Sequence, residues 1–458
     1  MTAPLSRRQV LRSAACGFGS LAFAGLATAA AKTHHAAKAK RVIFLFMHGG
    51  VSQMDSFDYK PRLTADHGKP LPFDLPGLIR PDRLGTVFAP KWKWKQHGES
   101  GRWASELFPH TAAISDKLCF VRSLHTDGEA HGQAVLRLHT GDANFVRPSL
   151  GSWVGYGLGN LSENLPGFVA LDYTADHGGE RNYGNAFLPA AHQGTRVKLA
   201  SAGGRVPEVR HLANDRLTAA RQKEQVDVIR ALGSAHLDAV GPDPQLDGVI
   251  DSFELAYRMQ KVAPEVLDLS RESAETHKLY GIGEEPTDAF GRQCLLARRM
   301  AEAGVRFVQV SSGYHWDHHG NIEKDLPASA AKTDRPAAAL VTDLARRGLL
   351  DDTLVLWAGE FGRTPVSQVS KTAPPGRDHN PHGYTVWLAG GGVKPGHAHG
   401  ETDDFGYLAV KDKAHMHDLH ATILHLLGLD HEKLTYRFAG RDFRLTDVYG
   451  HVVRELLA

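Results

Sequence analysis

Candidate metal ligands gather in one short part of the sequence, residues 306–321. This part begins with an apolar, β-branched run that predicts a buried strand, and a glycine ends the run. Four polar candidates follow: His315, Asp317, His318 and His319. Imidazole and carboxylate groups are ligands of zinc, manganese and iron, and a core strand positions ligands more rigidly than a loop does. The pattern predicts one wall of a metal site, and the alternative is a polar surface loop that contains histidines.

Polar side chains also follow other predicted strands. The apolar runs at residues 41–47 and 353–357 each end close to a candidate ligand, His48 and Glu360 respectively. In open α/β sheets, ligands bind where the carboxyl ends of the strands meet. These side chains could therefore share one site with histidines from the C-terminal part of the chain. The full set of predicted metal ligands is His48, Asp55, His315, Asp317, His319, Glu360, His379, His382 and His417.

Mixed histidine and carboxylate ligands predict one or two divalent metal ions, zinc or manganese first, with calcium or iron as alternatives. Paired metals about 4 Å apart are a known device for hydrolysing phosphate and sulfate esters. The expected substrate is therefore a small anionic ester or an anionic polymer. Thr126 and His131 follow the strand predicted at residues 118–121 and are the candidate catalytic residues, with helix capping as the alternative role for the threonine. Arginine binds anions through paired hydrogen bonds. The candidate substrate-binding residues are Arg122, Arg363 and Arg377.

The composition favours a globular protein that uses metal. Of the 458 residues, 42% are hydrophobic, enough for a large core, and the net charge of +2 predicts no nucleic-acid partner. Because neutral imidazole is the commonest metal ligand, the 27 histidines support the metal prediction. Cys119 and Cys294 are compatible with one disulfide or with two core thiols.

The N-terminus has the pattern of a twin-arginine signal peptide. Arg7 and Arg8 precede an apolar run of small residues, 14–31, with Ala-x-Ala cleavage sites at its end. A transmembrane anchor is the alternative, but the run is rich in Gly, Ala and Ser. We expect a signal peptide at residues 1–31, a linker at 32–40, and export by the twin-arginine machinery to the periplasm or beyond, with no stable membrane span after processing. This route exports folded proteins with their cofactors, which fits a metalloprotein.

Strands and helices alternate along residues 41–458, which predicts a single α/β domain with a mostly parallel sheet sandwiched by helices. A charged segment of helical spacing, about residues 208–303, is expected to be an insertion or a covering layer. Residues 60–116 are expected to be irregular. The alternating Lys and Trp residues at 91–95 favour an amphipathic edge strand over contact with an anionic polymer.

Several motifs together resemble one family of exported bacterial proteins. They are 47–58 (MHGGVSQMDSFD), 122–126 (RSLHT), 140–142 (TGD), 359–364 (GEFGRT) and 376–379 (GRDH). In combination with the twin arginines, they resemble the domain of unknown function 1501 family, often described as sulfatase-like, over about residues 40–455. That family is in turn similar to the alkaline phosphatase and sulfatase superfamily, which implies an alkaline phosphatase-like fold.

The resemblance implies roles for individual residues. His48 stands where the superfamily has a metal-binding aspartate after the first strand, and residues 315–319 stand where an aspartate and a histidine bind the second metal. Glu360 stands where an Asp-His pair follows a late strand. His417 or His420 is placed like the last metal-binding histidine.

Two departures from the superfamily pattern limit the prediction. No Cys-x-Pro-x-Arg motif precedes residues 140–141, so a formylglycine sulfatase is not expected, and Phe361 stands where a histidine is usual. We therefore predict an exported metal-dependent hydrolase of phosphate or sulfate esters. The alternative is a non-catalytic secreted binding or assembly protein that keeps the fold. A redox metalloenzyme is a third possibility, favoured only by the export route.

Overall fold

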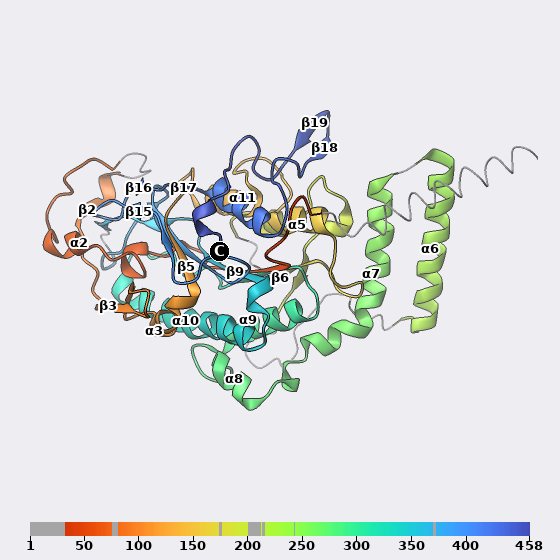
Figure 1. Cartoon of the computed structure of the whole chain (residues 1–458), viewed down its shortest axis with the longest axis horizontal. Helices are drawn as coiled ribbons and strands as arrows, with labels where there is room; N and C mark the ends of the chain where they lie inside the picture. Colours follow the sequence, from red (N-terminus) through yellow and green to blue (C-terminus); the bar gives the residue numbers. More distant parts are fainter. Residues whose placement is uncertain are drawn as a thin grey trace, which may run out of the picture.

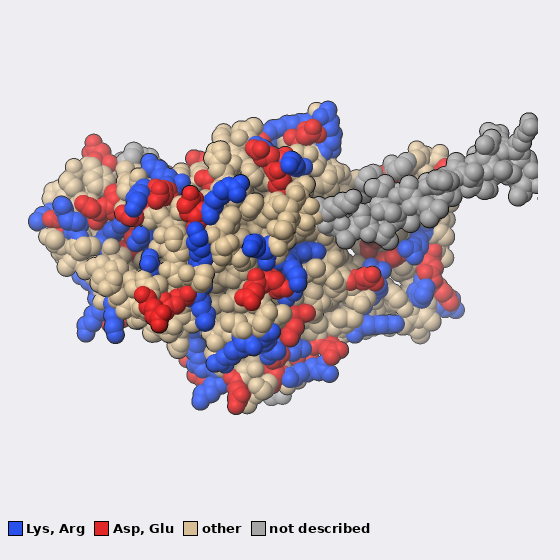
Figure 2. All heavy atoms as spheres, in the orientation of Figure 1, with Lys and Arg blue, Asp and Glu red and all other residues tan. Residues whose placement is uncertain are grey.

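A nine-stranded sheet runs through the centre of the computed structural model (Figure 1). The structure describes residues 33–75, 81–173, 176–199, 212, 216–241, 243–369 and 372–458. The predicted signal peptide, residues 1–31, lies outside the described residues. Acidic and basic side chains are interspersed over the face drawn in Figure 2, in keeping with the small net charge.

The sheet is mostly parallel. Its spatial order is β14 (Ala398–His399), β5 (Leu118–His125), β13 (Tyr384–Ala389), β9 (Thr353–Ala358), β1 (Arg41–Phe46), β8 (Phe307–Ser311), β6 (Phe168–Leu171) and β7 (Thr195–Val197), with β17 (Ala414–His415) also on β5. Only β13 runs antiparallel to its described neighbours, β5 and β9. At the centre, β9, β1 and β8 are parallel and in continuous register. The predicted parallel α/β sheet is therefore confirmed.

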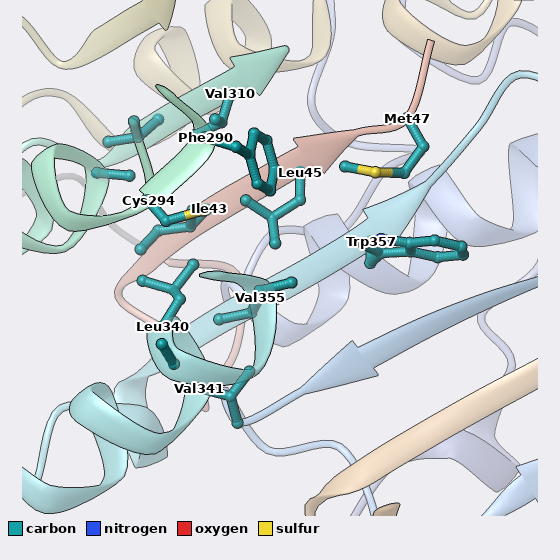
Figure 3. Close-up of a cluster of buried hydrophobic side chains, with 14 of the residues drawn as sticks. Ile43, Leu45, Met47, Phe290, Cys294, Val310, Leu340, Val341, Val355 and Trp357 are labelled. Atoms are coloured by element: carbon teal, nitrogen blue, oxygen red, sulfur yellow. The ribbon is translucent and has the colours of Figure 1, made fainter. Parts of the chain in front are cut away.

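Helices cover both faces of the sheet because its central strands are apolar on both sides. In β1, Ile43 and Leu45 contribute to one buried cluster, whereas Val42 and Phe44 contribute to the other. Figure 3 shows the first cluster, where strand residues pack against helical residues such as Phe290. The helices on that face are α3 (Pro109–Ala113), α8 (Ala274–Tyr280), α9 (Asp288–Glu302) and α10 (Ile322–Arg346), joined by the C-terminal end of α7 (Pro244–Leu267). Those on the opposite face are α4 (His131–Thr140), α5 (Leu150–Leu158) and α11 (Met416–Leu426). The predicted sandwich is confirmed.

The predicted helical segment, about residues 208–303, contains two structurally different parts. Its later part, α8 (Ala274–Tyr280) and α9, belongs to the layer against the sheet. Its earlier part, α6 (Ala219–Val240) and α7 (Pro244–Leu267), forms a hairpin that projects at one end of the molecule (Figure 1). The division of the chain into domains stays a prediction. In the part of the chain that the structure describes, no helix is both long and apolar enough to cross a membrane.

Short elements surround this sandwich. The Lys and Trp stretch leads into a hairpin of β3 (Trp94–His97) and β4 (Arg102–Ser105), with exposed lysines alternating with partly buried tryptophans, as expected of an edge strand. The remaining short helix and strands are α2 (Pro61–Ala65), β2 (Leu84–Val87), β10 (Gly362–Arg363), β11 (Val366–Gln368), β12 (His379–Asn380), β15 (Glu401–Thr402), β16 (Ala409–Lys411), β18 (Tyr436–Phe438) and β19 (Arg441–Phe443).

The two cysteines of the described chain are separate buried thiols. Cys119 lies in one apolar cluster and Cys294 in the other, on opposite faces of the sheet. Burial raises the pKa of the Cys119 thiol to about 12. We expect both residues to be alkylated equally in denaturant with and without prior reduction, as measured by peptide mass spectrometry. A disulfide-linked pair of peptides would contradict this fold.

Candidate metal centre

Three neighbouring parallel strands end at the site. His48 follows β1, Asp317 follows β8, and Glu360 follows β9, so the sheet brings the three side chains to one edge. Gly49 permits the close approach: a Cβ atom at this position would lie 2.6 Å from the backbone nitrogen of Asp317, and its φ of +120° is unfavourable for other residues. The backbone nitrogen of Gly49 also donates to both carboxylate oxygens of Glu360, at 3.0 and 3.1 Å.

Three imidazoles converge on the carboxylate of Asp317. Its Oδ1 atom lies 3.2 Å from Nε2 of His131, 3.1 Å from Nε2 of His319 and 3.3 Å from Nε2 of His379. His131 is the first residue of α4, His319 lies in the loop after β8, and His379 is in β12. These four residues form a group that could hold a metal ion, with all ligand atoms within 4.8 Å of one another.

The opposite nitrogen of each imidazole faces a hydrogen-bond acceptor. Nδ1 of His131 donates to Oε1 of Glu360 at 2.6 Å, and Nδ1 of His379 donates to the carbonyl of Glu129 at 2.6 Å. Nδ1 of His319 lies 2.5 Å from Oε1 of Gln368. Because these partners only accept, the hydrogen belongs on Nδ1, and Nε2 turns its lone pair toward the shared point. This is the outer hydrogen-bonding pattern of metal-binding histidines.

The separations of the three Nε2 atoms from Oδ1 of Asp317 are compatible with ligands of a transition metal ion. Bonds of about 2.0–2.2 Å in a tetrahedron place neighbouring ligands about 3.3–3.6 Å apart. The three observed Oδ1–Nε2 distances, 3.1–3.3 Å, are close to that separation. With slightly longer bonds, the same distances fit adjacent ligands of an octahedral ion. Nitrogen and oxygen donors without cysteine exclude the all-thiolate type of zinc site.

Burial and neighbouring charges shift the pKa values of residues in the group. Burial opposes ionisation of Asp317, but the three imidazoles and the Arg363 guanidinium outweigh it and hold the pKa of Asp317 far below its usual value. Burial would lower the pKa of His131, but the carboxylates of Asp317 and Glu360 outweigh it and raise that pKa. Burial lowers the pKa of His379 to about 4, so its Nε2 keeps a lone pair at neutral pH.

A second histidine pair adjoins the group without belonging to it. Nε2 of His48 lies 2.9 Å from Nδ1 of His177, and the His177 ring stacks on that of His131 with centroids 5.0 Å apart. Burial lowers the pKa of His48 to about 4, and its Nδ1 is buried without a hydrogen-bond partner. Tyr314 contacts all three rings and donates from its hydroxyl to Oδ2 of Asp317 at 2.7 Å. It thereby holds the second oxygen of that carboxylate.

Two of the predicted substrate-binding arginines are buried inside the protein. Arg363 donates to the backbone carbonyls of four residues and to Oδ1 of Asp317, at 2.7 Å. Arg377 makes a bidentate pair with Asp55, at 2.7 and 3.2 Å, in which both residues are almost fully buried. Ser52 donates to the same Asp55 carboxylate. Asp55 therefore lies in a buried ion pair and outside the metal-binding group.

The remaining predicted residues are distributed around the group. Thr126 is buried, its Oγ1 has no hydrogen-bond partner, and its backbone nitrogen donates to the carbonyl of Pro381, two residues from His379. Arg122 lies within β5, on the strand rather than at its end. The predicted ligands that lie outside the four-residue group are His48, Asp55, His315, Glu360, His382 and His417.

His417 lies in a different histidine cluster. Its ring contacts those of His415 and His420, with centroids 5.1 and 5.9 Å apart, and both of its nitrogens are buried without partners. His415 lies 3.3 Å from Asp127, on the loop that follows β5. The predicted role of His417 as a ligand stays a prediction, but the structure does not bring it into the group around Asp317.

Several residues around the group were missed in the sequence. His177 lies in a Gly-rich loop after β6, where an isolated histidine gives no local signal. Gln368 lies between the 359–364 and 376–379 motifs without belonging to either, and its contact with His319 depends on the path of the chain after β10. Tyr314 lies within residues 306–321, three residues after the end of β8, and this position was a usable signal.

Glu360→Gln tests the outer hydrogen bond to His131. The neutral amide would still accept from Nδ1 but would no longer supply negative charge, so we expect metal affinity to fall about 10–100-fold while the fold is kept. Competition with a fluorescent chelator measures this change. Glu401→Gln, at an exposed ion pair with Lys411, is the matched control and should leave the affinity unchanged. An equal effect of both variants would contradict the assigned role.

Fold and group together define a mixed α/β protein with a histidine–aspartate group that could hold a metal ion. The chain belongs to the family described as "Protein of unknown function (DUF1501)", whose model matches residues 39–457. The predicted family is thereby confirmed. No curated protein matches the sequence.

Several solved structures are distantly similar to this chain. The lipoteichoic acid synthase of Listeria monocytogenes has a TM-score of 0.38 at 11% identity, covering 90% of this chain and 76% of that chain. A sulfatase from Pseudoalteromonas sp. has a TM-score of 0.36 at 11% identity, covering 89% and 70%. The alkaline phosphatase of the Antarctic bacterium TAB5 has a TM-score of 0.32 at 9% identity, covering 85% and 98%.

Proposed function

We propose that this protein is an exported, metal-dependent hydrolase of phosphate or sulfate esters. One observation carries the proposal: three imidazole Nε2 atoms and one carboxylate oxygen converge at the carboxyl edge of the sheet, and each imidazole is oriented by a separate acceptor. Such an arrangement fixes a ligand set before any ion binds. The edge of an open α/β sheet is also where substrates of such folds bind.

The site would be loaded with zinc or manganese. A divalent ion held there would polarise an ester oxygen and lower the pKa of water. His319 is the most exposed ligand, with 37% of its side chain accessible, so substrate would approach on its side. Asp317 is held by Tyr314 and Arg363, which fixes the oxygen that faces the imidazoles.

Thr126, the hydroxyl residue predicted from the sequence, is the candidate nucleophile. Its backbone nitrogen donates to the carbonyl of Pro381, which is two residues from the ligand His379. Its Oγ1 is buried without a hydrogen-bond partner and is therefore not committed to capping a helix. His131 is better explained as a ligand than as a proton carrier, because its two nitrogens face Asp317 and Glu360.

A secreted metal-binding protein without catalytic activity is the second candidate. Four protein ligands fill the coordination of tetrahedral zinc and leave no open position, which is the pattern of structural zinc sites. Arg363 and Arg377 are engaged with carbonyls and carboxylates, so neither is free to hold an anionic substrate. Catalysis therefore favours an ion of higher coordination number, such as manganese.

The proposal that the protein is exported rests on the sequence of residues 1–31, which precede the described residues. We infer the twin-arginine route from Arg7, Arg8 and the apolar run that follows. Lysine at both arginine positions should retain the protein in the cytoplasm with its N-terminus unprocessed. Normal export of that variant would refute the route without affecting the metal proposal.

The decisive experiment combines metal analysis with a panel of phosphate and sulfate esters. We expect purified protein to contain at least one transition metal ion per chain and to hydrolyse one ester class, and His319→Ala to lose both. His315→Ala is the matched control, since His315 lies four residues earlier but outside the group. Stoichiometric metal without turnover would support the binding protein. Absence of metal after supplementation with zinc and manganese would refute both candidates.

A further inference from the structure

The two oxygens of the Asp317 carboxylate have different surroundings. The three imidazoles of the group approach Oδ1, at 3.1–3.3 Å, and the Arg363 guanidinium donates to this same oxygen at 2.7 Å. Oδ2 accepts instead from the hydroxyl of Tyr314, at 2.7 Å. Burial and this hydrogen bond raise the pKa of Tyr314, so its hydroxyl stays protonated and donates. The carboxylate therefore turns one oxygen toward the imidazoles and commits the other to Tyr314.

The backbone on both sides of Tyr314 is attached to the neighbouring strand. The backbone nitrogen of Ser312 donates to the carbonyl of Phe46 at 3.0 Å, and that of Trp316 donates to the carbonyl of His48 at 3.2 Å. Both acceptors belong to β1 or to the turn that follows it. Tyr314 and the carboxylate lie three residues apart on this attached loop, so their hydrogen bond requires little further ordering of the chain.

The ring of Tyr314 is held independently of its hydroxyl. Its centroid lies 4.7 Å from that of His48, 4.8 Å from that of His177 and 5.3 Å from that of His131. These separations are typical of favourable contacts between aromatic rings. A phenylalanine at this position keeps the ring and lacks only the hydroxyl, so Tyr314→Phe should remove the hydrogen bond without disturbing the packing.

The hydrogen bond to Oδ2 affects how Asp317 can bind a metal ion. A carboxylate binds an ion through one oxygen or through both. Hydrogen bonds to a charged carboxylate are about twice as strong as those between neutral groups, so the hydroxyl competes with an ion for Oδ2. With one oxygen from Asp317 and one nitrogen from each of the three imidazoles, the group supplies four donor atoms. An ion with five or six ligands then keeps at least one place for water or substrate.

We propose that Tyr314 is a positioning residue that keeps Asp317 a one-oxygen ligand. Without the hydroxyl, Oδ2 would be released, and the carboxylate could bind through both oxygens. The second oxygen would then take a place that water or substrate would otherwise occupy. The role of Tyr314 in turnover rests on the proposed function, whereas its effect on the carboxylate requires only that an ion binds.

Solvent-proton relaxation of the manganese-loaded protein tests the proposal, because the relaxation rate depends on the number of water molecules bound to each ion. We expect fewer bound water molecules in Tyr314→Phe than in the wild-type protein. The affinity for manganese should be kept or increased, since the released oxygen adds a ligand, whereas loss of a merely structural hydrogen bond would weaken binding. The kcat for the hydrolysed ester should fall about 10–100-fold.

Two further variants show whether the effect depends on the second oxygen. Asparagine has a single side-chain oxygen, so Tyr314→Phe in the Asp317→Asn background should leave the number of bound water molecules unchanged. Tyr156→Phe is the matched control. The hydroxyl of Tyr156 donates to the carbonyl of Thr435 at 3.1 Å, and Tyr156 lies outside the group, so this variant should change neither water number nor affinity.

The possible outcomes separate this proposal from the proposed function. Equal numbers of bound water molecules in Tyr314→Phe and the wild-type protein would overturn the role of Tyr314 and leave the hydrolase proposal intact. Reduced manganese affinity in Tyr314→Phe would overturn it as well. Fewer bound water molecules in a protein that hydrolyses no ester would support the role of Tyr314 and refute the hydrolase. A wild-type protein that binds no manganese would overturn the role of Tyr314 directly.

Discussion

Asp317→Ala is expected to abolish stoichiometric metal binding. Asp317 provides the one oxygen on which the Nε2 atoms of His131, His319 and His379 converge. Its removal takes away a ligand and also leaves the buried Arg363 guanidinium facing the cation without its carboxylate. We expect the loss of affinity to exceed the about 10–100-fold that removal of an outer hydrogen bond causes. Metal content after dialysis and chelator competition measure the effect.

The same substitution should reduce stability in the metal-free protein. Arg363 is 1% exposed, so losing its charged partner should lower the free energy of unfolding by about 3 kcal/mol. Asp317→Asn is the informative companion, since its single amide oxygen can accept from Tyr314 or from Arg363, but not from both, and the charge is removed. We expect intermediate affinity and a smaller loss of stability. If Asp317→Ala bound metal with the affinity of the wild-type protein, the ion would have to bind elsewhere.

Asp55→Ala is expected to destabilise the fold without weakening metal binding. Asp55 and Arg377 form a bidentate pair in which the side chains are 1% and 0% exposed. Removing the carboxylate leaves a buried cation without its counter-charge, which typically costs about 3–5 kcal/mol. Urea denaturation measures the loss, and chelator competition on the folded variant should give the wild-type affinity.

A surface ion pair provides the matched comparison. Arg62 and Asp66 interact at 2.8 Å, but the arginine side chain is 52% exposed, so Asp66→Ala should change stability much less than Asp55→Ala does. If Asp55→Ala instead removed the metal and left stability unchanged, Asp55 would be a ligand, as the sequence predicted, and the ion pair with Arg377 would be incidental.

The ion pairs of the two buried arginines change how the site must be understood. In the sequence, Arg363 and Arg377 stand in polar motifs at strand ends, which is where arginines that hold anions are found. In the structure, their hydrogen bonds connect the turns after β1 and β9 to the loop that carries Asp317. Their charges neutralise Asp317 and Asp55. A substrate anion would therefore depend on the ion itself for most of its binding.

The sequence predicted the fold from patterns that act locally. Continuous apolar runs such as residues 41–47 predicted strands buried on both faces, and these strands lie at the centre of the sheet. Parallel order follows from alternating strands and helices. The helical segment at about residues 208–303 was predicted as an insertion or a covering layer, and these alternatives stayed open because helical spacing alone does not distinguish a helix that packs on the sheet from one that packs mainly on its neighbour.

The sequence and the structure agree on part of the candidate ligand set, whose role in metal binding stays a prediction. Asp317, His319 and His379 were predicted as ligands and lie in the four-residue group, and His131 was predicted as catalytic. His382 and His417 lie outside the group, although they stand in polar segments similar to those of the histidines inside it. Whether a histidine joins the group depends on the direction in which its loop leaves the sheet, and no local pattern encodes that direction.

By itself, the sequence determined the family, the parallel sheet, and a gathering of histidine and carboxylate side chains at its carboxyl edge that could hold a metal ion. The tertiary structure decided which residues share that site, because coordination requires atoms within a few ångströms and residues 131, 317 and 379 are far apart along the chain. It also decided which nitrogens are available. The acceptors that orient the three imidazoles, on Glu129, Glu360 and Gln368, come from separate segments and meet the histidines only after folding.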